Sequence, residues 1–408
     1  MKVAIVSQYY KPENAKITNS LAAGLADRGH SVRVVTGYPN FPGGKLYAGY
    51  RQRFSHREMD GAVEVRRVPL IISHSQNPLG RVANYLSFAV SALSAGRFVA
   101  DADVVYVYAT PMTASLPPLL WRKFLDIPFV LHVQDLWPES ITESSMIRTR
   151  IVGRMVKAAL TPWLTFTYRS AAATIAIAPT MGEMLVKRGV SVEHLHVVLN
   201  WSSEEYQLAS KATGARSGLV VTYAGNIGAL QDLETIVQAA HRVQDLSGFR
   251  LVLVGSGTAE PGLKALVADL GAFSVEFRGR VDPTQMGEIY ADSDFQIVSL
   301  KDLDIFRGTI PSKLQSSLLH GVPVITTVAG DASALVSENQ LGLVAKPGDV
   351  DSVAAAFRDA YAMSEQDRSL MSHRARDFYD AHMGREAGVD AVERVLLDAA
   401  KTRPRSTK

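Results

Sequence analysis

The clearest structural signal in this chain spans residues 309–325, which read TIPSKLQSSLLHGVPVI. Proline is favoured near a helix start because its missing N–H is not needed there, and Ser312 beside it can cap the helix. Gly321 is suited to end the helix in the left-handed conformation, and Pro323 precedes an apolar run. The stretch therefore predicts a short helix followed by a buried strand, the alternation found in α/β domains.

The start of this short helix is also a candidate anion site. The first N–H groups of a helix have no partners within it, and the helix dipole places about half a positive charge at that end. Lys313 and Arg307 would add full charges. The competing interpretation is an ordinary capped helix without a ligand.

Short apolar runs alternate with helical segments over most of the chain. In the first half the predicted strands cover 3–6, 32–35, 63–68, 104–108, 129–133, 174–178 and 196–199. In the second half they cover 219–224, 250–254, 275–278, 295–299, 322–326 and 341–344. Apolar strands separated by helices are typical of parallel sheets covered on both faces, which bind ligands at the carboxyl ends of their strands. The sequence thus predicts two doubly wound α/β halves joined by a polar linker over 202–217.

Composition narrows the classes of protein and site. The chain has 408 residues, of which 47% are hydrophobic, so it is long enough for about two or three domains and too apolar to be disordered. Its 43 Lys and Arg nearly balance 40 Asp and Glu, which argues against a nucleic-acid binder. It has no cysteine, which excludes disulfides, a cysteine nucleophile and thiolate metal sites. Its apolar stretches are short or interrupted, so we expect no export signal and no spanning helix, and a cytoplasmic location.

Two glycine turns follow predicted strands of the second half. One reads YAGNIG and begins at Tyr223, and the other reads LVGSG and ends at Gly257. Glycine lets the backbone approach a ligand closely, so both turns could receive a phosphate group. Neither has the G-x-G-x-x-G spacing of a dinucleotide site, and each alone could be a plain tight turn.

A histidine and two carboxylates lie at the C-terminal end of the fifth predicted strand. The sequence there reads HVQDLWPES and contains His132, Asp135 and Glu139. Such groups at a strand end could position hydroxyls or transfer protons. The competing interpretation of His132 is a buried histidine satisfied within the protein. The polar loop after the first strand adds Asn14 and Lys16.

Five motifs run along the chain in order: YYKPEN at 9–14, HVQDLWPES at 132–140, NW at 200–201, YAGNIG at 223–228, and PSKL with GVPVI at 311–325. Together they resemble the family-4 glycosyltransferases of the GT-B fold, in particular the bacterial O-antigen and colanic-acid group that is similar to fucosaminyl transferases.

The resemblance implies an α/β fold of two Rossmann-like, doubly wound domains facing a cleft. The acceptor-side domain would cover 1–203 and be completed by 380–408, and the donor-binding domain would cover 204–379. A final helix near 386–400 would cross back onto the first domain.

The resemblance also implies an activity: retaining transfer of a sugar from a nucleotide-diphosphate donor to a hydroxyl of a glycan or lipid-linked acceptor in surface polysaccharide biosynthesis, without a cofactor or metal. His132 would contact the donor sugar. We assign catalysis to His132, Asp135 and Lys313, and the acceptor side to Asn14, Lys16 and Glu139. The residues assigned to the donor are Gly225, Asn226, Gly255, Gly257, Arg280, Arg307, Thr309, Ile310, Ser312 and Lys313.

The chain departs from the wider family at two places. The family's Glu-x7-Glu element falls on Gly308 and Ser316, and the usual Arg and Lys after the first strand of the second domain are replaced by Asn226 and the pair 231–232. We therefore expect Lys313, Arg307 and Arg280 to neutralise the diphosphate. The departing phosphate oxygen can take the acceptor proton, so a separate strong base is not required.

Two other functions fit the same fold: a nucleotide-sugar epimerase, and a two-lobed protein that binds a nucleotide or sugar without turning it over. The pair Asp302 and Asp304 could suggest a metal site, but we interpret it as a solvated acidic loop. Basic residues mixed with apolar ones over 79–99, 148–157 and 163–169 suit an anionic membrane surface and a polyprenyl-diphosphate-linked acceptor. The alternative for these segments is packing within the domain.

Overall fold

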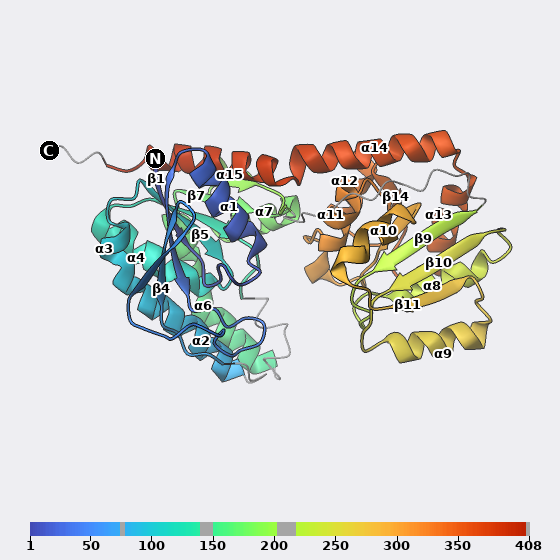
Figure 1. The fold of residues 1–408 in the computed structure, drawn as a ribbon, viewed down its shortest axis with the longest axis horizontal. Coiled ribbons are helices and arrows are strands. Elements are labelled where there is room, and N and C mark those ends of the chain that lie inside the picture. Colours follow the sequence, from blue (N-terminus) through green and yellow to red (C-terminus); the bar gives the residue numbers. More distant parts are fainter. Residues whose placement is uncertain (74–77, 139–149, 202–217, 405–408) are drawn as a thin grey trace. The chain divides into compact units, whose positions relative to one another are not determined.

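The computed structural model describes residues 1–73, 78–138, 150–201 and 218–404, so the predicted linker at 202–217 lies outside the described residues. The chain divides into two compact units, Met1–Ser203 with Arg385–Lys408 and Glu204–Gly384 (Figure 1). The second unit extends beyond 379 because α14 (Glu365–His382) packs along α11 (Ser312–Leu319).

The first unit is built on an eight-stranded sheet with the order β3-β4-β2-β1-β5-β6-β7-β8. Its strands are β1 (Lys2–Val6), β2 (Ser31–Gly37), β3 (His56–Asp60), β4 (Val63–Val68), β5 (Val104–Ala109), β6 (Phe129–Val133), β7 (Ala173–Ala176) and β8 (Leu195–Val197). Its helices are α1 (Lys16–Asp27), α2 (Pro78–Ala92), α3 (Gly96–Val99), α4 (Leu116–Leu125), α6 (Arg150–Ser170), α7 (Pro179–Lys187) and α15 (Arg385–Ala400). All neighbouring strands are parallel except β3 and β4.

Helix α15 completes the core of the first unit. It contacts α1, β5 and β6 and buries Val389, Val392 and Leu396 there. A Cβ atom on Gly388 would lie 2.2 Å from Cε3 of Trp201, so the helix backbone rests directly on the indole ring. The predicted return of the final helix onto the first domain is therefore confirmed.

The second unit holds a six-stranded parallel sheet with the order β11-β10-β9-β12-β13-β14. The strands are β9 (Leu219–Ala224), β10 (Phe249–Val254), β11 (Val275–Gly279), β12 (Phe295–Val298), β13 (Val324–Thr326) and β14 (Gly342–Val344). The remaining helices are α8 (Leu233–Arg242), α9 (Glu260–Leu270), α10 (Met286–Ala291), α12 (Asp331–Glu338) and α13 (Val350–Ala362).

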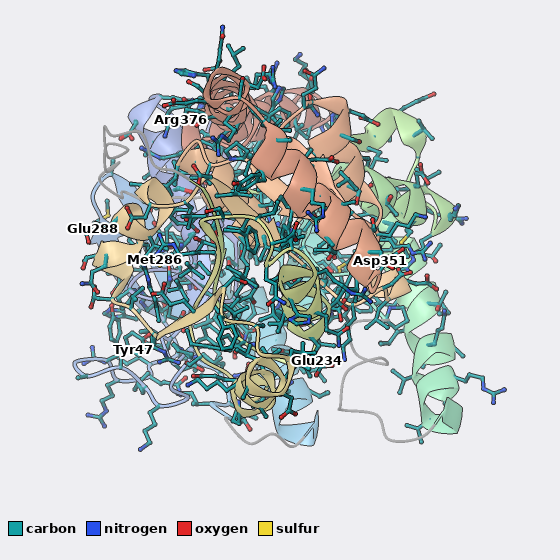
Figure 2. The ribbon with its side chains drawn as sticks, turned by 90° about the vertical axis from the view of Figure 1, so that its right-hand side faces the viewer. Tyr47, Glu234, Met286, Glu288, Asp351 and Arg376 are labelled. Carbon is teal, nitrogen blue, oxygen red and sulfur yellow. The ribbon has the colours of Figure 1, made fainter. Side chains whose placement is uncertain are left out.

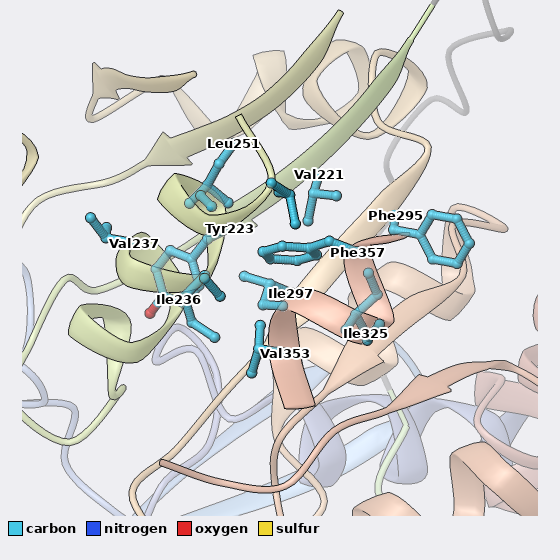
Figure 3. Close-up of a cluster of buried hydrophobic side chains, with 14 of the residues drawn as sticks. Val221, Tyr223, Ile236, Val237, Leu251, Phe295, Ile297, Ile325, Val353 and Phe357 are labelled. Carbon is cyan, nitrogen blue, oxygen red and sulfur yellow. The ribbon is translucent and has the colours of Figure 1, made fainter. Parts of the chain in front are cut away.

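Alternate residues of the strands in the second unit pack against helices on opposite faces of the sheet. On one face Phe357 of α13 lies among Val221, Ile297 and Ile325 (Figure 3). On the other, Val220 and its neighbours pack against α10. Strand order reverses between β9 and β12, and ligands of doubly wound sheets bind at such a switch point. The loops after these strands are therefore where a site is expected.

Candidate active site

A pocket of about 250 Å³ lies at the carboxyl ends of β9 and β10. Its lining residues are Gly225, Asn226, Val254, Gly255, Ser256, Arg280, Val281 and Met286. Four residues that the sequence assigned to the donor thus come together in one pocket of the second unit. Met286, which Figure 2 labels, contributes an apolar side chain from the first turn of α10.

Lys313 of α11 reaches the edge of this pocket. A Cβ atom on Gly225 would lie 2.4 Å from Cε of Lys313, so only glycine leaves room for the lysine. The Nζ atom donates a hydrogen bond to Oη of Tyr223 at 2.7 Å and lies 4.4 Å from the centroid of that ring. Tyr223 in turn donates to the carbonyl oxygen of Asn226 at 2.6 Å. Tyr223 therefore fixes the lysine against the glycine turn.

The charge of Lys313 has no counterion among the described residues, where its Nζ atom bonds only to the tyrosine hydroxyl. Burial lowers the pKa of Lys313 to about 8, from an ordinary value of 10.5, so the side chain is still largely protonated at pH 7. A half-buried ammonium without a carboxylate is suited to an anionic ligand.

The start of α11 adds two open N–H groups. Pro311 occupies the N-cap position and Ser312 is the first helical residue, so the prediction that Ser312 caps the helix is wrong. No described residue accepts a hydrogen bond from the backbone N–H of Ser312 or Lys313. Gly321 ends the helix with φ +64°, as predicted. Of the other assigned residues in this region, Thr309 and Ile310 form the half-buried loop before the helix.

The glycine turns have a different role from the one that we expected. The N–H of Gly225 donates to Val254 at 2.8 Å and that of Gly255 donates to Gly279 at 2.7 Å, so neither amide is open to a phosphate. A Cβ atom on Gly255 would lie 1.8 Å from the carbonyl oxygen of Gly225, and one on Gly257 would lie 2.1 Å from that of Ile227. These glycines let neighbouring loops pack closely, which is the plain-turn interpretation.

The two predicted arginines differ in their surroundings. Arg307 is exposed and forms ion pairs with Asp302 at 3.3 Å and Asp304 at 3.4 Å, so a diphosphate would have to compete with two carboxylates for it, and its assignment to the diphosphate stays a prediction. Arg280 is exposed at the pocket and has no ion pair among the described residues. The acidic pair Asp302 and Asp304 thus forms ion pairs with Arg307. The part of the chain that the structure describes contains no cluster of three metal-ligating side chains.

In the first unit, His132 is fully buried, as the competing interpretation proposed, but its ring is not fully satisfied by the described residues. Its Nδ1 atom is hydrogen-bonded to Oη of Tyr106 at 2.6 Å, whereas its Nε2 atom has no partner among the described residues. Burial lowers the pKa of His132 to about 3, so the ring is neutral at pH 7. A neutral ring can accept or donate a hydrogen bond but cannot supply charge.

The remaining assigned residues of the first unit are only partly placed. Asp135 is exposed beyond β6, Asn14 is exposed just before α1, and Lys16 is the first residue of α1. Glu139 lies outside the described residues. Among the described residues, the His132 ring is hydrogen-bonded to Tyr106 and not to Asp135 or Asn14.

Tyr223 is the residue of this region that sequence reasoning missed. It stands in a buried strand, where a tyrosine is typical of the core. The available signal was its hydroxyl, because a buried Tyr O–H usually needs a partner. A strand-end tyrosine beside a glycine turn, together with a lysine at the start of a helix on the same sheet, could have suggested this pair.

Comparison with known proteins agrees with this architecture. Residues 15–201 match the glycosyl transferase 4-like domain, and residues 218–363 match the glycosyl transferases group 1 family. A protein of Escherichia coli strain K12, WcaI, which is named as a colanic acid biosynthesis glycosyl transferase, is 27% identical over 390 residues, covering 88% of this chain and 92% of that protein.

Two solved structures share the whole fold. The Anabaena protein HepE in complex with UDP has a TM-score of 0.66 at 16% identity, covering 97% of this chain and 100% of its own. Sucrose-phosphate synthase from Thermosynechococcus elongatus has a TM-score of 0.67 at 15% identity, covering 97% and 98%. The two domain matches, in the expected order along one chain, confirm the resemblance found in the sequence: this chain belongs to the family-4 glycosyltransferases of the GT-B fold and is a glycosyltransferase.

Proposed function

We propose that the chain transfers a sugar from a nucleotide-diphosphate donor, with retention of anomeric configuration, to a hydroxyl of a glycan or lipid-linked sugar acceptor in surface polysaccharide biosynthesis. The main observation behind this proposal is Lys313, a half-buried cation beside the 250 Å³ pocket that has no carboxylate partner in the described parts of the chain. The diphosphate would accept hydrogen bonds from Lys313 and from the two open amides of α11, with Arg280 nearby.

These hydrogen-bond donors would stabilise the diphosphate as the bond between it and the sugar breaks. Negative charge grows on the leaving diphosphate as the glycosidic bond lengthens, and fixed donors are most effective where charge develops. The leaving phosphate oxygen then takes the acceptor proton. His132, neutral and buried, would hold a hydroxyl of the donor sugar through its free Nε2 atom rather than transfer a proton.

The names of similar proteins support the substrate classes. HepE has been crystallised with UDP-glucose, and WcaI is named for colanic acid biosynthesis. Another protein of the same fold, WaaG, acts in lipopolysaccharide biosynthesis. We therefore propose a nucleotide sugar as donor and a surface glycan as product.

The experiment is a screen of nucleotide sugars that measures release of free nucleotide diphosphate with and without glycan acceptors. Release that requires both partners, with an NMR-assigned product of unchanged anomeric configuration, supports the proposal. Conversion of the donor without acceptor would establish the epimerase instead. Binding of UDP without turnover of any donor would favour a binding protein.

Metal independence forms part of the proposal. Lys313 and the α11 amides would supply the charge stabilisation that a divalent ion supplies elsewhere. We expect transfer to continue in excess EDTA, and complete loss that is restored by Mg²⁺ would contradict this.

Attachment at an anionic membrane surface, at the inner face where lipid-linked acceptors would be reached, is a further part of the proposal. Helices α2, α4 and α6 contain Arg and Lys but no Asp or Glu, and α4 and α6 expose large apolar side chains such as Phe124 and Phe166. No helix in the described ranges is long and apolar enough to cross a membrane. Sedimentation with vesicles of anionic and of neutral lipids tests this, and equal failure with both would contradict it.

A further inference from the structure

A second pocket, of about 380 Å³, lies in the first unit and is distinct from the surroundings of His132. Loops after β1 and β2 and the first turns of α2 form its walls. The residues that matter most for its chemistry are Tyr9, Asn40, Phe41, Arg81, Asn84 and Tyr85.

The polar walls of this pocket are held in place by buried hydrogen bonds. The Oε1 atom of buried Glu13 accepts from the backbone N–H groups of Asn40 and Phe41, both at 2.8 Å. Asn84 accepts from Nε2 of Gln8 at 2.6 Å and donates to the carbonyl of Ile71 at 2.7 Å. The pocket is therefore already formed without a ligand.

Both asparagines are more than nine-tenths buried, with 5% and 6% of their surface exposed, and yet retain unused hydrogen-bonding capacity. The Nδ2 group of Asn40 donates to Tyr38, but its Oδ1 atom has no partner among the described residues. Asn84 uses one of its two amide hydrogens. One acceptor and one donor thus remain for a ligand that carries hydroxyl groups.

Aromatic rings supply the apolar part of the pocket. The rings of Tyr9 and Phe41 lie 5.3 Å apart at 50°, and Phe41 is 52% exposed. Tyr85 adds a third ring from α2. Rings combined with a few fixed amide groups suit a saccharide, whose C–H face packs on a ring while its hydroxyls bond to amides.

Arg81 gives the pocket its charge. None of the described lining residues is acidic, and the guanidinium of Arg81 has no ion-pair partner in the described part of the chain. Burial raises the pKa of the Tyr9 and Tyr85 phenols, and Arg81 acts against that rise at both, whereas Glu13 adds to it at Tyr9 and Asp135 adds to it at Tyr85. Arg81 is nevertheless the charged side chain in the lining itself, so an anionic group on a ligand is favoured beside it rather than throughout the pocket.

We infer that this pocket is the acceptor subsite, and that it selects a sugar bearing a negatively charged group, a carboxylate or a phosphate. The ring packs between Phe41 and the tyrosines, the asparagines bond to its hydroxyls, and Arg81 binds the anion. This inference rests on the proposed function, because it names the acceptor of that reaction. It differs from the sequence assignment, which placed the acceptor at Asn14, Lys16 and Glu139.

The test is NMR or calorimetric titration of the intact protein, saturated with UDP, using three probes: methyl glucuronide, glucose 6-phosphate and methyl glucoside. We expect at least one charged probe to bind about tenfold more tightly than the neutral one, as befits a charge-assisted hydrogen bond. Which charged probe binds tells a carboxylate from a phosphate. Equal binding of all three, or no binding, overturns the inference.

Two pairs of variants test whether Arg81 and Phe41 cause these differences in binding. Arg81→Gln should remove the preference for charge and leave binding of the neutral probe unchanged, whereas Arg97→Gln, an exposed arginine outside the pocket, should keep it. Phe41→Ala should weaken all three probes, and Phe54→Ala, 70% exposed and not in the pocket, should weaken none. A preference for charge that survives Arg81→Gln in a normally folded variant overturns the inference.

UDP binding separates this inference from the proposed function. If UDP binds and the charged probes show no preference, the acceptor inference fails alone. If no nucleotide diphosphate binds to the protein, the proposed function fails, whatever the saccharides do.

Discussion

Lys313 is a half-buried cation whose only hydrogen-bond partner within the described ranges is the hydroxyl of Tyr223. Lys313→Met should therefore weaken UDP binding by about ten- to a hundredfold, since a charged hydrogen bond contributes roughly 1.5–3 kcal/mol. Tyr223→Phe keeps the charge but removes the hydroxyl that holds it, so it should cost less, about 1 kcal/mol or several-fold. Calorimetric titration with UDP measures both.

The matched control for this pair is Lys264→Met. Lys264 lies on α9, pairs with Glu260 at 2.8 Å and is absent from the pocket lining. The Lys264→Met variant should bind UDP as tightly as the unmodified protein does. An unchanged affinity in Lys313→Met, with a normal thermal unfolding midpoint, would exclude the lysine from the donor site.

The pKa of Lys313 makes donor binding depend on pH. In the free protein the ammonium is present below about pH 7 and is lost as the pH rises through 8, because burial lowers its pKa to about 8. A bound diphosphate favours the ammonium, so affinity for UDP should fall progressively between pH 7 and pH 9 or so. The slope should vanish in Lys313→Met and persist in Arg307→Gln. Isothermal titration across this range measures it, and an equal slope in both variants would assign it to another group.

At the scale of elements, the contact between α15 and Trp201 predicts that replacing a helical glycine by alanine will destabilise the protein, the opposite of the usual effect. Alanine normally stabilises a helix relative to glycine, by roughly 1 kcal/mol. Gly388→Ala should instead destabilise the protein, by about 1–3 kcal/mol, because its methyl group would overlap the indole. Gly262→Ala on α9, where nothing lies within 4 Å, should be neutral or stabilising. Urea unfolding compares the two, and equal shifts would contradict the contact.

The elements themselves were largely predictable from the sequence because parallel strands are buried on both faces and read as apolar runs. β3 was missed for the opposite reason. It is the edge strand, reads HREMD, pairs antiparallel with β4 and buries none of its residues fully. Such a strand is held by its neighbour rather than by a hydrophobic pattern, so nothing local distinguishes it from a polar loop.

The site was less predictable than the fold. Sequence position placed Gly225, Gly255 and Arg280 at one pocket because strand ends share an edge of the sheet. It could not show that the amides of Gly225 and Gly255 donate to neighbouring backbone carbonyls, or that Arg307 forms ion pairs with Asp302 and Asp304. Those facts depend on side-chain directions and loop packing that a single sequence does not encode in its pattern.

At the scale of the molecule, the first unit depends on the last part of the chain. Removing residues 385–408 would expose the surface that Val389, Val392 and Leu396 bury, together with Trp201, and would leave Arg28 without its partner Glu393. Truncation after Gly384 should therefore unfold or loosen the first unit while the second keeps its core. Hydrogen exchange followed by mass spectrometry should show lost protection in β1, β5 and β6 and unchanged protection in β9 and β10. Uniform protection in both units would show that α15 is dispensable.

Helix α15 also determines the order in which the two units can fold during synthesis, because it belongs to the first unit but follows the second unit in the sequence. A ribosome makes the first unit's sheet early, yet α15, which completes the core of that unit, is made only after the whole of the second unit. The half that is made first is thus the half that matures last. Until α15 has been made, the apolar surface around Trp201 is the one that a chaperone would need to shield.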